Sequence, residues 1–163
     1  MYAKKIILAT AIAAQFMGCR GFEDGYVFTG SLGFRENAPL VSEGFAVCSA
    51  VILDYENKAV FAHALPSGVR SPQGGPINAD NVVEYLCLEV SKHGIKPEDT
   101  RAFIDAGSQE DIEIIKRGLE RRGIKIEEAI VDPATCFNLK TISYDPVSNK
   151  MSAYRSSDIG EGK

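Results

Sequence analysis

Two apolar runs on either side of a short polar turn constrain the fold of this chain more than any other feature. The first run, "FAVCSAVIL", spans residues 45–53, and the second, "AVFAHAL", spans residues 59–65. The cluster between them, "DYENK", is typical of a turn. Short apolar runs bounded by a turn predict buried β-strands, so we expect an antiparallel hairpin at this point of the chain.

Strand patterns account for much of the remaining sequence. Apolar and β-branched residues predict strands at residues 26–34, 101–107, 124–131, 137–144 and 150–156. The segments "RENAPL" before the hairpin and "PSGVRSPQGGP" after it carry the proline, glycine and polar residues that are typical of loops.

Two helices are expected among these strands. Asn78 or Asp80 can cap the first, which we expect to run to about His93. Ser108 can cap the second, and Asp111 lies three residues later, as in a capping box. This order of elements predicts an α/β (α+β) fold in which two helices pack on one mixed, largely antiparallel sheet.

Length and charge limit the class of protein. The chain has 163 residues, enough for one domain with a hydrophobic core, and 45% of them are hydrophobic. The net charge of −4 argues against nucleic acid as a partner. The 2 histidines and 4 cysteines lack zinc-binding spacing, and no glycine-rich segment has the lysine of a phosphate-binding loop. The sequence therefore has no zinc signature and no phosphate-binding loop.

The N-terminus has the pattern of an export signal. A basic start precedes an apolar run at residues 6–17, which is too short for a comfortable transmembrane helix. A small residue and then Cys19 follow, as at the cleavage site of a bacterial lipoprotein, where Cys19 would be lipidated. We expect a signal peptide at 1–19 and one domain at 20–163, exported and either membrane-anchored or secreted. The alternative is a buried N-terminal element and a cytoplasmic protein, with Cys19 as a core thiol.

Cys48 in the first strand of the hairpin and His63 in the second form a candidate catalytic pair. If residues 54–57 make a four-residue loop, the two residues face each other with Cβ atoms roughly 4.5–5.5 Å apart. A neighbouring imidazolium lowers the pKa of a thiol from its usual value of about 8.5, and the same histidine can serve as acid and base in acyl transfer. A shorter loop would shift this register, and both side chains can instead be ordinary core residues.

The window from Ser42 to Pro66 resembles the core motif of the CheD chemoreceptor glutamine deamidases. In that family a cysteine starts a strand, a short turn follows, and a second strand ends in "AH" shortly before "LP", as Cys48 and "AHALP" do here. The family has a threonine six residues before the cysteine, at the position of Ser42. Weaker similarity extends over residues 26–155. Bacterial deamidase toxins of the cytotoxic-necrotizing-factor and lethal-factor type share the cysteine–histidine pair and the architecture.

The resemblance implies a layered deamidase fold and a cysteine-dependent protein-glutamine deamidase that needs no metal or organic cofactor. By position, Cys48 would be the nucleophile, His63 the general acid and base, and Ser42 the group that orients the imidazole. The backbone N–H of Cys48 or of a neighbour would bind the oxyanion. The partner would be a protein that bears a reactive glutamine.

Two other functions fit the same residues. A catalytically silent lipoprotein module could keep the fold and bind a partner, because the bulky "FAV" before Cys48 can close a pocket. Transglutamination or hydrolysis of another amide would use the same cysteine–histidine pair.

The remaining cysteines and the second histidine have mainly structural interpretations. Cys87 is expected in the core, and Cys136 is a loop residue, a resolving thiol or the disulfide partner of Cys87. His93 is expected to play a structural role at the end of the first helix.

Overall fold

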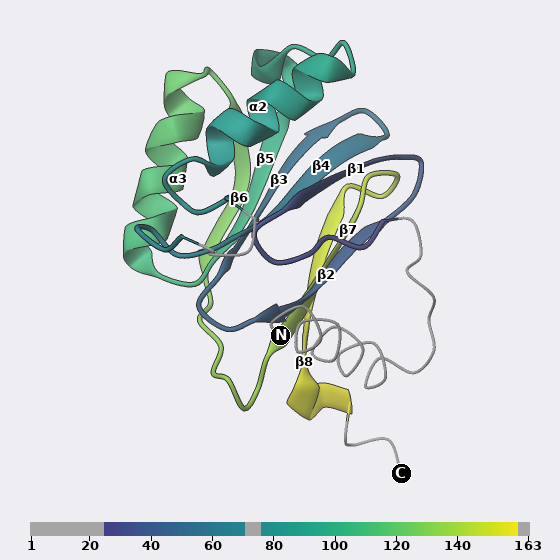
Figure 1. Cartoon of the computed structure of the whole chain (residues 1–163). Helices are drawn as coiled ribbons and strands as arrows, with labels where there is room; N and C mark the ends of the chain where they lie inside the picture. Colours follow the sequence, from purple (N-terminus) through teal and green to yellow (C-terminus); the bar gives the residue numbers. More distant parts are fainter. Residues whose placement is uncertain (1–24, 71–75, 160–163) are drawn as a thin grey trace, which may run out of the picture.

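The described chain forms two sheets and two α-helices, seen in the computed structural model of residues 25–70 and 76–159 (Figure 1). The strands are β1 (Leu32–Glu36), β2 (Leu40–Phe45), β3 (Ser49–Tyr55), β4 (Lys58–Ala64), β5 (Arg101–Ala106), β6 (Lys125–Val131), β7 (Lys140–Asp145) and β8 (Lys150–Arg155). The helices are α2 (Val82–Lys92) and α3 (Gln109–Arg121), with short 3₁₀ turns η1 (Pro97–Asp99) and η2 (Ser156–Ile159).

These elements stack in three layers. The middle layer is a five-stranded sheet in the order β1-β4-β3-β5-β6, with α2 and α3 on one face. A three-stranded sheet in the order β2-β7-β8 covers its other face. The α+β class with largely antiparallel strands is confirmed, although the strands divide between two sheets where the sequence predicted one.

The predicted hairpin is confirmed as β3 and β4, and both strands lie inside the large sheet. Tyr55 pairs with Lys58, so the turn consists of Glu56 and Asn57 alone. Glu56 adopts a left-handed backbone conformation with φ 54°. Nearly every residue of the two strands is buried, as expected for strands covered on both faces.

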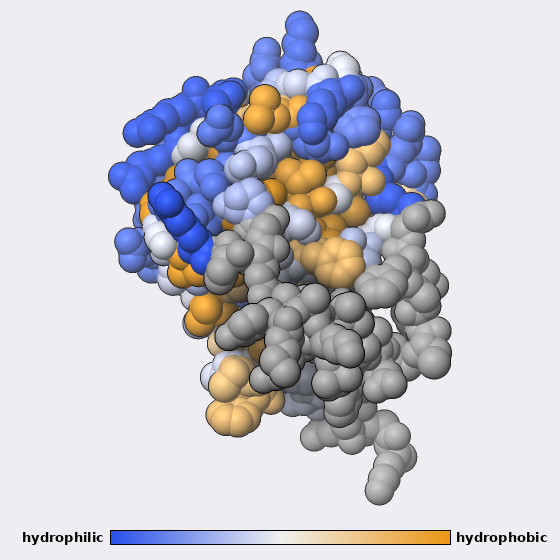
Figure 2. Space-filling model, viewed as in Figure 1, coloured by the Kyte–Doolittle hydropathy of each residue, from blue (hydrophilic) through white to orange (hydrophobic). Residues whose placement is uncertain are grey.

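Alternate residues of β3 enter two separate cores. Val51 and Leu53 pack toward the helices, whereas Ala50 and Ile52 pack toward the small sheet. The outward face of α3 is charged, and Figure 2 shows mainly hydrophilic side chains over this helix. The helices therefore cover one core, and the small sheet covers the other.

The apolar run at residues 45–53 is not one strand, and this differs from the expectation. β2 ends at Phe45 in the small sheet, and β3 begins at Ser49 in the large sheet. A β-bulge between Ser42 and Phe45, with Gly44 at φ 82°, interrupts the pairing of β2 with β7, which resumes at Phe45 and Lys140. Cys48 consequently lies in the connection between the sheets, one residue before β3.

Both predicted helices are confirmed, but only one of their caps is. The side chain of Ser108 accepts a hydrogen bond from the backbone N–H of Asp111 at 3.1 Å, as predicted for α3. α2 begins after Asn81, whose side chain makes no capping hydrogen bond to the helix. Its last turn is followed by His93, which stacks on Phe34 with ring centroids 3.5 Å apart.

The expected signal peptide at 1–19 and lipidated Cys19 lie outside the described residues. Within the described chain, no helix has both the length and the apolar character needed to cross a membrane.

Candidate active site

Ser42, Cys48 and His63 all lie in the layer between the two sheets. Ser42 comes from β2 of the small sheet, His63 comes from β4 of the large sheet, and Cys48 comes from the connection that joins the sheets. Ser42 and His63 are completely buried, and Cys48 is 9% exposed. The fold thus places three residues that span 22 positions of sequence in one layer, and of these Ser42 and His63 are in hydrogen-bond contact.

The pairing of Cys48 with His63 is not the one that the sequence predicted. Because the turn has two residues rather than four, His63 pairs with Ala50. Cys48 precedes Ala50 by two residues and packs in the same core, which places it diagonally from His63. Diagonal neighbours on one sheet face are roughly 7–8 Å apart, farther than directly opposed residues.

Ser42 determines which ring nitrogen of His63 carries the proton. Its hydroxyl lies 2.5 Å from the carbonyl oxygen of Val27 and 2.8 Å from Nδ1 of His63. A hydroxyl has one proton to donate, and a carbonyl can only accept, so that proton goes to Val27. The Ser42 oxygen must then accept a hydrogen bond from the Nδ1–H of His63. The Nε2 atom of His63 is left with its lone pair, as a general base requires.

Phe45 holds the imidazole from one side. The rings of Phe45 and His63 are stacked, with centroids 3.7 Å apart and planes 10° apart. Nε2 of His63 is buried and makes no hydrogen bond among the described residues. Burial lowers the pKa of His63 to about 3, so the ring is neutral at physiological pH.

Cys48 is also neutral, contrary to the expected thiolate–imidazolium pair. Burial, with a smaller contribution from the negative charge of Asp111, raises the pKa of Cys48 to about 11. A neutral imidazole offers no positive charge to offset either effect. The resting site is therefore a thiol beside a neutral base, because the two sheets exclude the water that would stabilise an ion pair.

Gly107 brings the chain after β5 against the backbone that carries Cys48. A Cβ atom on Gly107 would lie 2.1 Å from the carbonyl oxygen of Val47 and 2.9 Å from that of Cys48. The backbone N–H of Gly107 also donates to Oγ of Ser49 at 3.3 Å. Only glycine permits so close an approach.

The backbone N–H of Cys48 is available as an oxyanion donor. It donates to no acceptor within the described chain. The adjoining connection is anchored by a hydrogen bond from the N–H of Ala134 to the carbonyl oxygen of Ala46, at 3.0 Å. In acyl transfer generally, a preorganised N–H group beside the nucleophile stabilises the tetrahedral oxyanion.

The side chain of Asp111 does not make the capping-box contact that the sequence predicted for it. In a capping box its side chain would reach back to the backbone N–H of Ser108. Instead Oδ1 of Asp111 accepts a hydrogen bond from the backbone N–H of Ser67 at 3.0 Å. Ser67 follows His63 by four residues, so this carboxylate ties the start of α3 to the end of the strand that carries the histidine. The aspartate in place of the usual glutamate was the only sequence signal for this role.

A buried ion pair flanks the site on the other side of Ala50. Asp105 of β5 pairs with Ala50 in the strand register, and its Oδ1 accepts a hydrogen bond from Nζ of Lys140 at 2.5 Å. Both side chains are almost completely buried between the sheets. Sequence patterns gave no sign of this pair, because Lys140 lies in a strand 35 residues away.

The other candidate residues do not join the site. Cys87 is buried against the helix-side core and Cys136 is exposed, and both are free thiols, so they do not form the disulfide that the sequence left open. Nε2 of His93 lies 3.3 Å from Oε1 of Glu89 on α2, which fits the structural role expected for it.

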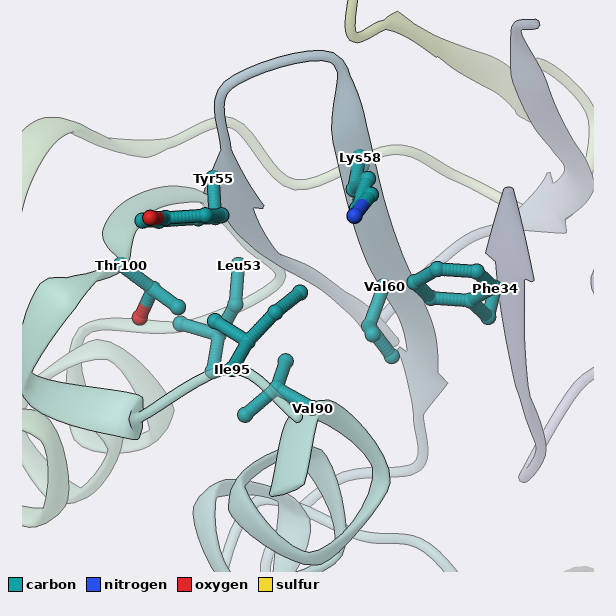
Figure 3. A pocket seen from close by; sticks show the side chains of 9 residues that line it. Phe34, Leu53, Tyr55, Lys58, Val60, Val90, Ile95 and Thr100 are labelled. Carbon is teal, nitrogen blue, oxygen red and sulfur yellow. The ribbon is translucent and has the colours of Figure 1, made fainter. Parts of the chain in front are cut away.

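Two hollows of the described chain lie away from Cys48. The pocket in Figure 3 is on the helix side of the large sheet, where Leu53, Val60, Val90 and Ile95 converge, and it has no room for a water molecule. A larger hollow of about 390 Å³ lies between the start of β1 and α2. Neither is lined by Ser42, Cys48 or His63.

Comparison with known proteins does not assign this site. No protein-family model matches the chain, and no curated protein matches its sequence. Among the described residues, no group of three or more histidine, cysteine, aspartate and glutamate side chains is arranged to hold a metal ion.

Proposed function

We propose that the protein is a cysteine-dependent protein-glutamine deamidase, in which Cys48, His63 and Ser42 carry the reaction. One observation supports this proposal above the others. The hydroxyl of Ser42 gives its proton to Val27, so the buried His63 keeps an unprotonated Nε2 on the same side of the sheet as the Cys48 thiol. The resemblance of Ser42–Pro66 to the CheD deamidases assigns the same three roles.

The reaction begins with proton transfer from the Cys48 thiol to Nε2 of His63 as the sulfur attacks the carboxamide carbon of a glutamine side chain. The carbonyl π electrons move to oxygen, and the backbone N–H of Cys48 stabilises the oxyanion. The oxyanion collapses, the C–N bond breaks, and Nε2–H protonates the leaving nitrogen, which departs as ammonia. A thioester on Cys48 remains.

Water completes the cycle. Nε2 of His63 takes a proton from water as its oxygen attacks the thioester carbon, and a second tetrahedral oxyanion forms. Collapse breaks the C–S bond, and the proton returns to the Cys48 sulfur. The balance is one glutamine and one water consumed, with one glutamate and one ammonia produced. No step requires a metal or an organic cofactor.

Ammonia release and mass spectrometry of the substrate test this proposal. The full chain is incubated with a library of glutamine-containing peptides and with folded proteins, alongside Cys48→Ser and Cys136→Ser variants. We expect ammonia and the conversion of glutamine to glutamate with the wild type and with Cys136→Ser, because Cys136 is exposed on a loop outside the site. Conversion that persists in Cys48→Ser would contradict the proposed chemistry.

Adding a primary amine separates deamidation from transglutamination. An acyl-enzyme that prefers amines to water would give a peptide–amine adduct in place of glutamate, with the same ammonia release. We expect glutamate as the main product, because water is the proposed acceptor.

A catalytically silent binding module is the second candidate function. Its supporting observation is the burial of Cys48, together with a thiol pKa of about 11 and the position of Cys48 outside the two hollows described above. For such a module, Cys48→Ser and the wild type would bind a partner equally, and neither would release ammonia from any glutamine substrate.

We propose in addition that the protein is exported and anchored through Cys19. The support is the sequence pattern of residues 1–19 alone. Expression with a radiolabelled fatty acid, followed by membrane fractionation, tests it. Label and membrane association are expected in the wild type and not in Cys19→Ser, and an unlabelled wild-type protein in the cytosolic fraction would contradict the proposal.

A further inference from the structure

Asp111 lies at the same end of the large sheet as Cys48 and His63. β3 begins there, whereas β4 and β5 both end there, since β3 is antiparallel to each of them. The chain after β5 passes Gly107, which packs against the Val47–Cys48 peptide, and then enters the first turn of α3, where Asp111 lies. On its other side Asp111 is tied to the chain that follows His63, through Ser67.

One oxygen of this carboxylate has no hydrogen-bond partner in the described part of the chain. Asp111 is 2% exposed, and its Oδ1 accepts the N–H of Ser67. Oδ2 is buried and makes no hydrogen bond among the described residues. Burying a carboxylate oxygen without a hydrogen-bond donor costs free energy. An oxygen of this kind beside a candidate site therefore points to a ligand that supplies the missing N–H or O–H donor.

The chemistry of a primary carboxamide matches the groups at this end of the sheet. Its nitrogen carries two N–H donors, and its oxygen is an acceptor. A carboxylate can only accept, so it suits the nitrogen, and the backbone N–H of Cys48 suits the oxygen. With both ends held, the carbon between them is presented to the Cys48 sulfur. A carboxylate product has no N–H to offer and carries a like charge, so it is bound less well than the amide.

We propose that Asp111 is a specificity residue that accepts an N–H of the substrate carboxamide attacked by Cys48. This inference rests on the proposed deamidase function, and it names the group by which the site distinguishes an amide from an ester or an acid. It differs from the roles of Ser42 and His63, because Asp111 contacts the nitrogen of the substrate and takes no part in proton transfer.

Two small alkylating reagents test this inference without a known substrate. Iodoacetamide and methyl iodoacetate are both neutral and similar in size, but only the amide has N–H donors. Each is applied to the full chain at one fixed alkaline pH, and the rates at Cys48 and at the exposed Cys136 are measured by peptide mass spectrometry. The amide-to-ester rate ratio at Cys48, divided by the ratio at Cys136, cancels differences in intrinsic reagent reactivity and in thiolate fraction.

We expect this normalised ratio to favour the amide roughly tenfold in the wild type, the size expected of one hydrogen bond to a charged group. In Asp111→Asn it should fall to about one, because an amide nitrogen then replaces the accepting oxygen. Asp80→Asn is the matched control: Asp80 accepts hydrogen bonds from Ser67 and Gly68 in the same loop, with both of its oxygens partnered. It should leave the ratio unchanged.

The outcomes separate the two proposals. A wild-type ratio near one, or a ratio that Asp111→Asn does not alter, would overturn the role of Asp111 and leave the deamidase testable by ammonia release. If Cys48 reacts with neither reagent over the whole accessible pH range while Cys136 does, both proposals fail. The wild-type ratio alone decides the matter if Asp111→Asn does not fold.

Discussion

Replacing Ser42 tests the hydrogen bonds on which the proposed base depends. Ser42 is completely buried, and its hydroxyl serves both the carbonyl of Val27 and the Nδ1–H of His63. The informative pair of variants is Ser42→Thr and Ser42→Val, because the two side chains have nearly the same shape and differ in the hydroxyl. Each adds volume to a packed layer, and that cost is common to both.

The expected difference in stability between these variants comes from two polar groups that lose their hydrogen-bond partner. In Ser42→Val, the buried carbonyl of Val27 and the buried Nδ1–H of His63 lose their partner, at ~1–3 kcal/mol for each group. We therefore expect Ser42→Val to be less stable than Ser42→Thr by about 2–6 kcal/mol, measured as the free energy of unfolding in urea. A smaller loss is expected if the imidazole turns and donates elsewhere.

Imidazole ¹⁵N shifts add a readout that a purely structural role would not move. In the wild type and in Ser42→Thr, His63 should be the Nδ1–H tautomer at neutral pH, with unprotonated Nε2. In Ser42→Val this preference should be lost, and with it the general base. Equal stabilities and an unchanged tautomer in the two variants would refute the hydrogen-bond assignment.

Three further predictions follow from burial between the sheets. The pKa of His63 is lowered to about 3 in the folded protein, below the ordinary 6.5, so the unfolded chain binds more protons between these two pH values. The free energy of unfolding should therefore fall as the pH drops from about 6.5 toward 3, by up to ~1.4 kcal/mol per pH unit. His63→Gln should remove this part of the slope, whereas His93→Gln should not. At neutral pH, Cys48 should be alkylated much more slowly than Cys136, and its alkylation rate should rise about tenfold per pH unit up to about pH 11. A Cys48 thiol that reacts fully below pH 8 would contradict the assignment of Cys48 and His63 as a neutral pair. Lys140→Met should cost about 3–5 kcal/mol by leaving Asp105 buried and unpaired, and adding Asp105→Leu should recover most of that loss in urea unfolding.

Periodicity and turn chemistry predicted the elements that depend on local sequence. The hairpin around "DYENK", the helix capped by Ser108 and the helix ending at His93 were all readable, because their apolar residues repeat at the spacing of a strand or a helix. The same signals drew attention to Cys48 and His63 on either side of one turn, and the resemblance of Ser42–Pro66 to the CheD deamidases added Ser42. Sequence alone was therefore enough to predict the fold class, whereas the roles of these three residues belong to the proposed function.

Geometry within the site was not predictable in the same way. "DYENK" fits a turn of two or four residues equally well, and the choice moves His63 from Cys48 to Ala50. The run at residues 45–53 is apolar except for Ser49, although Val47 is exposed, so hydrophobicity gave no sign that the chain changes sheet just before β3. The pKa values depend on how deeply the second sheet covers the site, a property of long-range packing.

The neutral state of Cys48 and His63 determines how the proposed reaction can proceed. Their pKa values of about 11 and about 3 make a separated thiolate–imidazolium pair a rare state of the resting protein. Attack must then be concerted, with the proton reaching Nε2 while the sulfur bonds to carbon, so that no isolated thiolate forms. The oxyanion creates negative charge next to the newly protonated His63, and that charge supports the imidazolium which the empty site disfavours. A dyad of this kind is slow toward simple thiol reagents at neutral pH and becomes more reactive when a substrate carbonyl is in place.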